Sequence, residues 1–249
     1  MGLTPRKGQT DRCRVNCPLQ YTFPMIAVIV LVDYAPSAKV WGWLRFVIGR
    51  FSLMGTPGLA FFKILGSGED GGFGLTPSAT RQGLYCVFDT EAHADHFIQQ
   101  SNVLARYRAH AREFFTAKLA PYSVKGSWAG HTLQVNATAP ESGPIAALTR
   151  ASIRPSKALA FWRNSPPAEA SLMHADGCLL AVGLGEAPIF RQATFSLWES
   201  VDAMNRYART GAHMEAIQAS LHGHHFSESM FVRFRPITHS GVWKGKVFA

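Results

Sequence analysis

The sequence is poor in charged residues, and acidic residues are especially scarce. Asp and Glu number 16 in 249 residues, and charged residues make up 16% of the chain, against about 25% in an average soluble protein. The acidic residues are scattered, which argues against hydrolysis by a carboxylate pair. The net charge of +9 attracts an anionic membrane face, an acidic redox partner or nucleic acid. No nucleic-acid motif is present, which makes nucleic acid the weakest of these three partners.

Cysteines are few, and long apolar runs are absent. Cys13, Cys17, Cys86 and Cys178 have no zinc-ribbon spacing and form no Cys-x-x-Cys-His motif for covalent haem. We interpret them as free thiols in a reducing compartment, which favours a cytoplasmic location. The longest apolar run, residues 23–32, is far shorter than the about 20 residues of a membrane span. It therefore predicts a buried strand, and no cleavage site of a signal peptide follows it.

Common catalytic and nucleotide-binding motifs are also missing. The chain has no Ser-His-Asp signature, nucleophile elbow or Rossmann fingerprint. The glycine-rich stretch 66–72 lacks the Gly-Lys-Ser/Thr of a phosphate loop, and a strand pattern follows it. We interpret this stretch as the connection of a β-hairpin.

The sequence does contain an internal repeat. Four segments of the first half recur in order in the second half: 36–37 with 155–156, 66–69 with 183–186, 85–88 with 195–198, and 127–130 with 242–245. A nearly constant spacing of similar segments predicts two copies of one structural unit.

Each copy has the pattern of a ferredoxin-like β-α-β-β-α-β unit. In the first half we predict strands 25–32, 59–65, 83–88 and 122–128, a helix that starts at 36, and a helix over 91–119 that breaks near 101–102. In the second half we predict strands 145–153, 178–183, 192–198 and 231–237 and helices 155–163 and 201–221.

The unit covers only one face of its sheet with helices, so the other face needs a partner. We predict an α+β fold in which the two tandem ferredoxin-like repeats form an intrachain dimeric α/β barrel with the helices outside. The predicted domain boundaries are a disordered basic tail at 1–22, a first half at 23–130, a linker at 131–143 and a second half at 144–249. The alternative is two independent domains on a flexible linker, which would leave two apolar sheet faces bare.

Among ten histidines, one has an informative position. Residues 222–225 hold three histidines, but Gly223 interrupts them and no carboxylate or Cys completes a metal site. His213 lies at the edge of an apolar stripe on the predicted helix 201–221. From the residues alone it is either a core histidine bonded to a backbone carbonyl or a ligand.

Short segments along both halves carry a resemblance to a known family. They are 56–58, 61–68, 107–108, 148–153, 183–188, 194–198, His213, 216–217, Glu228 and 231–234. In these segments, within about residues 25–245, the chain resembles the spheroidene monooxygenases, bacterial enzymes that oxygenate acyclic carotenoids. Two places depart from the family pattern: residues 179–182 read Leu-Leu-Ala-Val where the family has a Phe-Lys pair, and His225 replaces a Trp.

The resemblance implies a haem-dependent monooxygenase of carotenoid biosynthesis. Such an oxidoreductase, of the EC 1.14 type, inserts oxygen from O2 at C2 of an acyclic carotenoid by hydroxylation and further oxidation to a ketone. The resemblance implies a non-covalent haem b with His213 as the axial ligand of the iron, because His213 stands at a family motif position. Arg150, Arg233 and Arg108 are the candidate partners of the haem propionates, and Phe195 is a further candidate cofactor-binding residue.

The resemblance also implies an apolar carotenoid-like substrate, O2, an electron donor such as ferredoxin, and peripheral contact with the inner membrane. Two other functions stay open. One is a haem enzyme of the same barrel with a different reaction, such as a peroxidase, an aldoxime dehydratase or a small-substrate oxidase. The other is a cofactor-free barrel that acts as a monooxygenase or a binding protein.

Overall fold

The computed structural model describes residues 25–69, 71–72, 76–187, 190–209 and 211–249. The predicted tail at 1–22 lies outside the described residues. The first half consists of β1 (Ile26–Tyr34), η1 (Pro36–Ala38), α1 (Lys39–Ile48), α2 (Arg50–Leu53), β2 (Leu59–Gly68), β3 (Pro77–Phe88), α3 (Glu91–Gln100), α4 (Asn102–His110) and β4 (Ala111–Gly126). The second half consists of β5 (Ile145–Ile153), η2 (Pro155–Lys157), α5 (Ala158–Met173), β6 (Cys178–Ala187), β7 (Arg191–Trp198), α6 (Val201–Ala208), α7 (Gly211–His222), β8 (Phe226–Trp243) and β9 (Lys246–Phe248).

Local sequence explains where several elements begin. All nine residues of β1 are buried, as expected of an apolar strand that is covered on both faces. The hydroxyls of Thr90, Ser101 and Ser200 accept backbone N–H groups at the starts of α3, α4 and α6, which satisfies donors that have no partner inside the helix.

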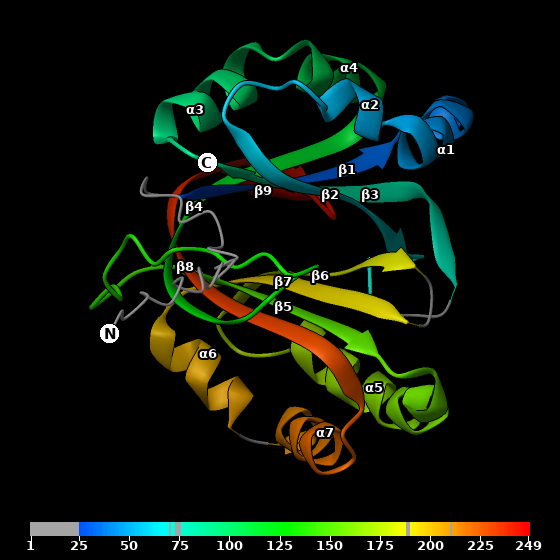
Figure 1. Cartoon of the computed structure of the whole chain (residues 1–249), viewed down its shortest axis with the longest axis vertical. Coiled ribbons are helices and arrows are strands. Elements are labelled where there is room, and N and C mark those ends of the chain that lie inside the picture. Colours follow the sequence, from blue (N-terminus) through cyan, green and yellow to red (C-terminus); the bar gives the residue numbers. More distant parts are fainter. Residues whose placement is uncertain (1–24, 70, 73–75, 188–189, 210) are drawn as a thin grey trace, which may run out of the picture.

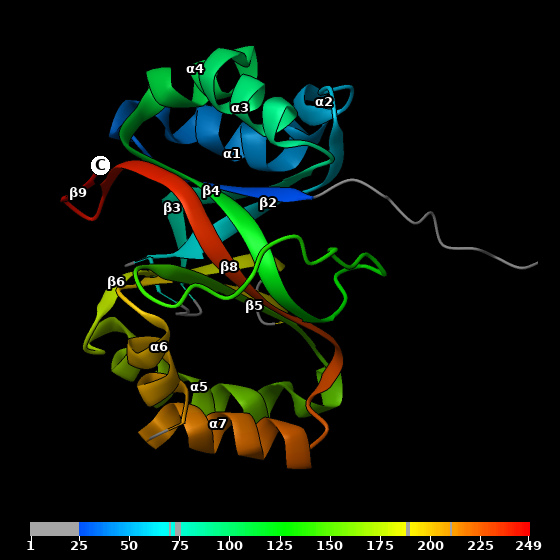
Figure 2. The ribbon, with the colours of Figure 1, turned by 90° about the vertical axis from the view of Figure 1, so that its left-hand side faces the viewer.

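The strands form one closed barrel. Their order is β4-β1-β3-β2-β6-β7-β5-β8-β9, and β4 also pairs with β8 along the register Phe115↔Gly241 to Gly126↔Met230. Figure 2 shows β8 running beside β4, with one helical layer above the barrel and one below it. The predicted barrel of two ferredoxin-like repeats is therefore confirmed (Figure 1).

Three of the predicted helices differ from the structure. The helix predicted over 91–119 ends at His110, and residues 111–119 belong to β4, because their pairing with both β1 and β8 outweighs an ambiguous apolar pattern. The helix predicted over 201–221 is divided into α6 and α7, and Gly211 has a φ of +59° at the start of α7. The helix predicted to end at 163 continues to Met173, where packing against α7 outweighs two prolines.

The strands are also longer than predicted. β3 begins at Pro77, β4 spans 111–126 where 122–128 is predicted, and β8 spans 226–243 where 231–237 is predicted. Pairing across the closure of the barrel supplies partners to strand ends that carry weak sequence signals. The glycine-rich stretch joins the antiparallel neighbours β2 and β3, so its interpretation as a hairpin connection is confirmed.

The buried core has three parts. Side chains from the eight barrel strands β1–β8 fill the interior, among them Tyr85, Phe115, Phe195 and Phe234, and Trp128 beyond the end of β4 packs with them. A second cluster joins the first-half sheet to α3 and α4, and a third joins the second-half sheet to α5 and α6. Because the interior is packed with side chains, a large ligand has more room on the outer faces of the barrel.

The barrel closure predicts a stability difference between two glycines. Gly241 has a φ of +117°, and an added Cβ would lie 2.1 Å from the carbonyl oxygen of Phe114 on β4. Gly245 has a φ of +74° with nothing within 4 Å of an added Cβ. We expect Gly245→Ala to lower the free energy of unfolding by about 1 kcal/mol, from backbone strain alone, and Gly241→Ala by about 3 kcal/mol or more. Urea unfolding followed by circular dichroism measures both, and equal losses would contradict the assigned closure.

Candidate functional site

The two halves present equivalent outer sheet faces to their helices. Strand registers align Ile26↔Phe88 of the first half with Ile145↔Trp198 of the second. The same registers extend to β2 and β6. Each outward position of one half therefore has a counterpart in the other half.

The counterparts differ in size. In the first half the outward positions hold Val28, Val30, Val32, Phe62, Ile64, Leu84 and Cys86, and in the same order the second half holds Ala147, Thr149, Ala151, Ala181, Gly183, Thr194 and Ser196. We call these seven residues of the second half the small-residue face. The first-half side chains pack against helices. The side chains of the small-residue face are smaller than their first-half counterparts, and two of them, Ala147 and Ala181, pack against residues of α5 and α6.

Helix α7 lies on the side of the small-residue face, and its main helix contacts are with α5 and α6. In Figure 1 these three helices form the layer below the second-half strands. Glu215, Gln218 and His222 are exposed and mark the solvent side of α7. At 100° per residue, position 213 lies on the opposite side of the helix. The side chain of His213 lies outside the described residues.

A groove of about 430 Å³ crosses the seam where β2 pairs with β6. Its walls include Trp43 and Phe46 of α1 and Trp162 of α5; α1 belongs to the upper helical layer and α5 to the lower one, both at the right of Figure 1. Its floor is rich in glycine, and Gly183 belongs both to the groove and to the small-residue face. The groove therefore runs from the molecular surface to the edge of the small-residue face.

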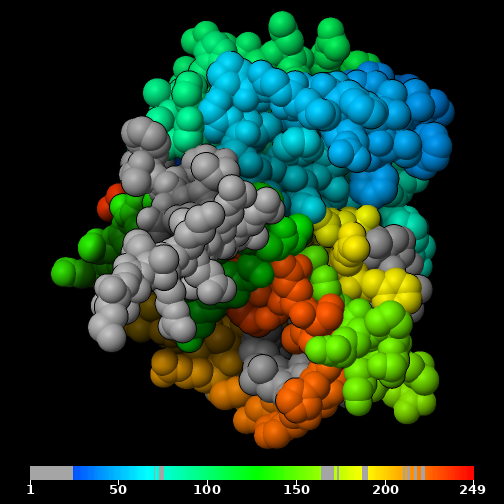
Figure 3. All heavy atoms as spheres, in the orientation of Figure 1, coloured from blue at the N-terminus to red at the C-terminus, as the bar shows by residue number. Residues whose placement is uncertain are grey.

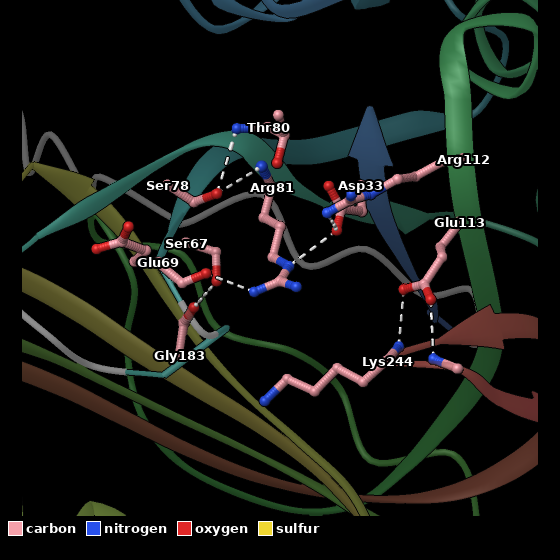
Figure 4. Close-up of polar contacts among 11 residues, drawn as sticks. Asp33, Ser67, Glu69, Ser78, Thr80, Arg81, Arg112, Glu113, Gly183 and Lys244 are labelled. Atoms are coloured by element: carbon pink, nitrogen blue, oxygen red, sulfur yellow. Dashed lines mark hydrogen bonds and ion pairs between the residues drawn. The ribbon is translucent and has the colours of Figure 1, made fainter. Parts of the chain in front are cut away.

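Hydrogen bonds hold the two polar side chains Ser67 and Arg81, which line part of the groove. Arg81 donates from Nε to the Asp33 carboxylate at 3.0 Å and from a terminal nitrogen to the Glu69 carbonyl, and Ser67 donates to the Gly183 carbonyl at 2.7 Å (Figure 4). Burial acts to raise the pKa of Asp33, but hydrogen bonds from Arg112 and Arg81 outweigh it and lower that pKa. The arginine is thus held by a carboxylate whose lowered pKa favours the ionised form.

Arg150 lies in a buried ionic cluster between the halves. It is 3% exposed, forms an ion pair with Glu228 and lies 3.6 Å from a carboxylate oxygen of Glu186. Its guanidinium stacks over the Trp128 ring, 5.5 Å from the ring centre. Lys63 also pairs with Glu186 at 2.7 Å. The charge of Arg150 is therefore already balanced by protein carboxylates.

Glu228 is strongly acidic in this cluster. Burial acts to raise its pKa, but backbone N–H groups of Gly130 and Ala129, with Arg150 and Ser127, lower the pKa to about 2. These partners come from both halves of the chain, so the carboxylate connects the start of the 131–143 segment to β5 and β8.

The other predicted site residues lie apart. Arg233 lies on β8 in register with Ala147, which places it beside the small-residue face. Phe195 is 1% exposed within the barrel interior, on the opposite sheet face. Arg108 lies on α4 of the first half, where it donates to the Ile98 carbonyl at 2.9 Å. The structure thus places Arg233 and the helix of His213 on the outer side of the second-half strands.

No group of three or more His, Cys, Asp and Glu side chains suited to a metal ion occurs among the described residues. Cys86 and Cys178 are free thiols, and burial raises the pKa of Cys178 to about 11 and that of Cys86 further. Both thiols stay protonated at neutral pH, so neither is an activated nucleophile. Cys13 and Cys17 lie outside the described residues.

Sequence reasoning missed the small-residue face and the groove. Neither has a motif of its own. The internal repeat contained the signal for the small-residue face, because Ala181 and Gly183 stand where the first half has Phe62 and Ile64. The groove depends on the β2–β6 seam, which brings Trp43 close to Trp162, and the sequence gives no sign of that proximity.

Comparison with known proteins finds close relatives with one name. A spheroidene monooxygenase of Rubrivivax gelatinosus is 58% identical over 221 residues, which cover 89% of this chain and 86% of the relative. A second, from Rhodobacter capsulatus, is 36% identical over 84% of this chain and 89% of the relative. No family model matches the chain.

Among solved structures, an aldoxime dehydratase is similar with a TM-score of 0.56, over 89% of this chain and 88% of the other. The sequence identity is 8%, so the similarity concerns the fold alone. It agrees with the observed barrel of two repeats.

The Glu228 cluster predicts an acid-sensitive contribution to stability. Glu228→Gln removes a charge that Arg150 and three hydrogen-bond donors stabilise, so the free energy of unfolding should fall by about 1–3 kcal/mol at pH 7. Since the folded pKa lies below the ordinary value of 4.5, this stabilisation is present above pH 4.5 and is lost as the pH falls towards 2.

Urea unfolding at pH 7, 5 and 3 measures this effect. The gap between wild type and Glu228→Gln should narrow with falling pH, whereas Glu141→Gln, at an exposed position, should match wild type throughout. A gap that is constant with pH would refute the assigned ionisation.

Proposed function

This chain belongs to the spheroidene monooxygenase family, and from that membership we propose that it is a haem-dependent monooxygenase that oxidises an acyclic carotenoid at C2. The observation that carries the haem assignment is the small-residue face, which lies on the same outer side of the second-half strands as α7. Protein interiors are close-packed, and a sheet face without bulky side chains suits a flat group placed between it and a helix.

His213 is the proposed axial ligand of the haem iron. Position 213 lies on the side of α7 opposite to its exposed residues, and a neutral imidazole is a good ligand for iron. With no Cys-x-x-Cys-His motif in the chain, the haem would be held without covalent bonds, by this ligand, by packing and by its propionates.

Arg233 is the best placed of the three candidate propionate partners. It lies beside the small-residue face, whereas Arg150 is occupied by Glu228 and Glu186 and Arg108 lies in the first half. An arginine on this face can bind a propionate with two parallel hydrogen bonds.

The groove at the β2–β6 seam is the proposed binding path of the carotenoid chain. Aromatic walls at Trp43, Phe46 and Trp162 and a floor of glycines form an apolar surface that suits a long, thin polyene. Because Gly183 links the groove to the small-residue face, one end of a polyene bound there would reach the layer below α7.

The reaction requires O2, electrons and protons. In each hydroxylation one oxygen atom of O2 enters the C2–H bond, and two electrons and two protons convert the other to water. A second hydroxylation at C2 gives a geminal diol, which loses water to form the ketone. When bound, the haem supplies the iron centre at which O2 is activated. The hydroxyls of Thr149 and Thr194, cross-strand partners on the small-residue face, are the polar groups that this face would offer to a molecule in the same layer.

An electron donor such as ferredoxin is the proposed redox partner, because a chain of net charge +9 attracts an acidic protein. The two free thiols favour the cytoplasm, and the apolar substrate favours peripheral contact with the inner membrane. Among the described residues, the structure has no helix with the length and hydropathy of a membrane span.

Product analysis tests the proposed activity. The haem-loaded protein, ferredoxin, its reductase, NADPH and spheroidene should yield C2-oxygenated products under ¹⁸O2 that carry the label, as read by mass spectrometry. An unlabelled product, or conversion that persists without O2, would contradict a monooxygenase.

His213→Ala should weaken haem binding by more than 100-fold, since loss of even an outer-shell partner of a ligand costs about 10–100-fold. The control is His222→Ala on the exposed side of the same helix, which should bind haem like wild type. Titration with hemin, followed at the Soret band, gives both affinities. A Soret band of normal position and affinity in His213→Ala would reject the ligand assignment.

Ala181→Phe should abolish haem binding while the fold remains. The equivalent first-half position holds Phe62, so the sheet tolerates phenylalanine there, but the added ring would fill the layer that the haem needs. Ala105→Phe, at an exposed position on α4, is the matched control. Hemin titration combined with far-UV circular dichroism separates lost binding from lost folding, and unchanged haem affinity in Ala181→Phe would place the cofactor elsewhere.

A further inference from the structure

One helical face of the first half is apolar and exposed. Along α1 and α2, Val40 is 72%, Trp43 63%, Val47 50%, Phe51 69% and Met54 60% exposed. Leu44 and Ile48 lie between them and are 39% and 42% exposed. We call these seven residues the α1–α2 face. Figure 3 shows α1 and α2 in blue at the upper right of the molecule.

The α1–α2 face is one regular side of two helices whose other side is buried. Its residues recur at spacings of three and four, the repeat of one side of a helix. Gly42, Gly49 and Leu53 on the opposite side are buried, so both helices are seated with their other side on the barrel. Soluble proteins rarely expose an apolar face of this kind without a binding partner.

The charges around the α1–α2 face point to the chemistry of its partner. Lys39 and Arg50 are exposed on the two helices, and residues 35–68 contain no Asp or Glu. The whole chain carries a net charge of +9. A helix that combines apolar residues with basic residues and lacks acidic ones is typical of a segment that lies in the interface of an anionic bilayer.

The α1–α2 face also adjoins the groove. Trp43 belongs to both, and Phe46 on the same helix lines the groove wall. A surface that rests on the α1–α2 face would therefore lie beside the groove mouth. An apolar ligand could then pass from that surface into the groove without crossing water.

We propose that the α1–α2 face docks the protein on an anionic lipid bilayer and sets the groove mouth against the membrane. The apolar side chains enter the boundary between headgroups and acyl chains, and the exposed Lys39 and Arg50 contact the lipid phosphates. The delivery of substrate through this contact rests on the proposed function; the docking itself does not.

Vesicle binding tests the docking. Full-length protein is mixed with sucrose-loaded vesicles of phosphatidylcholine with 30% phosphatidylglycerol and sedimented. The test variant is Val40→Glu/Val47→Glu. The matched control is Val247→Glu/Val135→Glu, in which two valines of similar exposure, 73% and 54%, receive the same charges elsewhere on the surface.

Wild type and the control pair should bind alike, and the test pair should bind at least tenfold more weakly. Wild-type binding should also weaken on pure phosphatidylcholine and in high salt. The proposal is overturned if wild type fails to sediment with anionic vesicles or if both pairs lose binding equally. It is also overturned if wild type is a dimer without lipid that the test pair disrupts, because a second copy would then cover this face.

Turnover separates docking from chemistry. With spheroidene embedded in the same vesicles, the test pair should oxidise it at least tenfold more slowly than the control pair, and with spheroidene in detergent micelles at an equal rate. Equal rates in vesicles would refute delivery from the membrane. If wild type oxidises spheroidene in neither medium, the proposed function fails, while sedimentation still decides the docking.

Discussion

The pairing of β4 with β8 is the constraint on which the rest of the structure depends. It runs from Phe115↔Gly241 to Gly126↔Met230 and joins the two ends of a single sheet, so that no edge strand is left between the two repeats. Closure commits the inward side chains of both halves to one packed interior and turns the helices outward. A large ligand must then use an outer face or the seam where β2 meets β6.

The two repeats have diverged on those outer faces. The first half fills its helix–sheet layer with Val28, Phe62 and Leu84. The second half has the smaller residues Ala147, Ala181 and Thr194 at the same positions. The first half thus carries the α1–α2 face, and the second half carries the layer proposed for the cofactor. The groove connects the two because it lies on their junction.

Much of the fold was predictable from the sequence, because the repeat and the strand 145–153 have strong local patterns. The helix predicted over 91–119 failed where Phe114 and Phe115 suit either periodicity, and only the pairing of β4 with two neighbours decides between them. The site was less accessible. The role proposed for His213 rests on the resemblance, whereas Ala181 and Gly183 become informative once strand registers align them with Phe62 and Ile64. Trp43 and Trp162 line one groove only in the folded barrel.

The central claim is that the layer between α7 and the small-residue face holds one haem b. A pyridine haemochrome assay on protein purified after expression with a haem supply tests this claim most directly. The account predicts a haem b spectrum at close to one haem per chain. A colourless protein that takes up no hemin at equimolar concentration would contradict it.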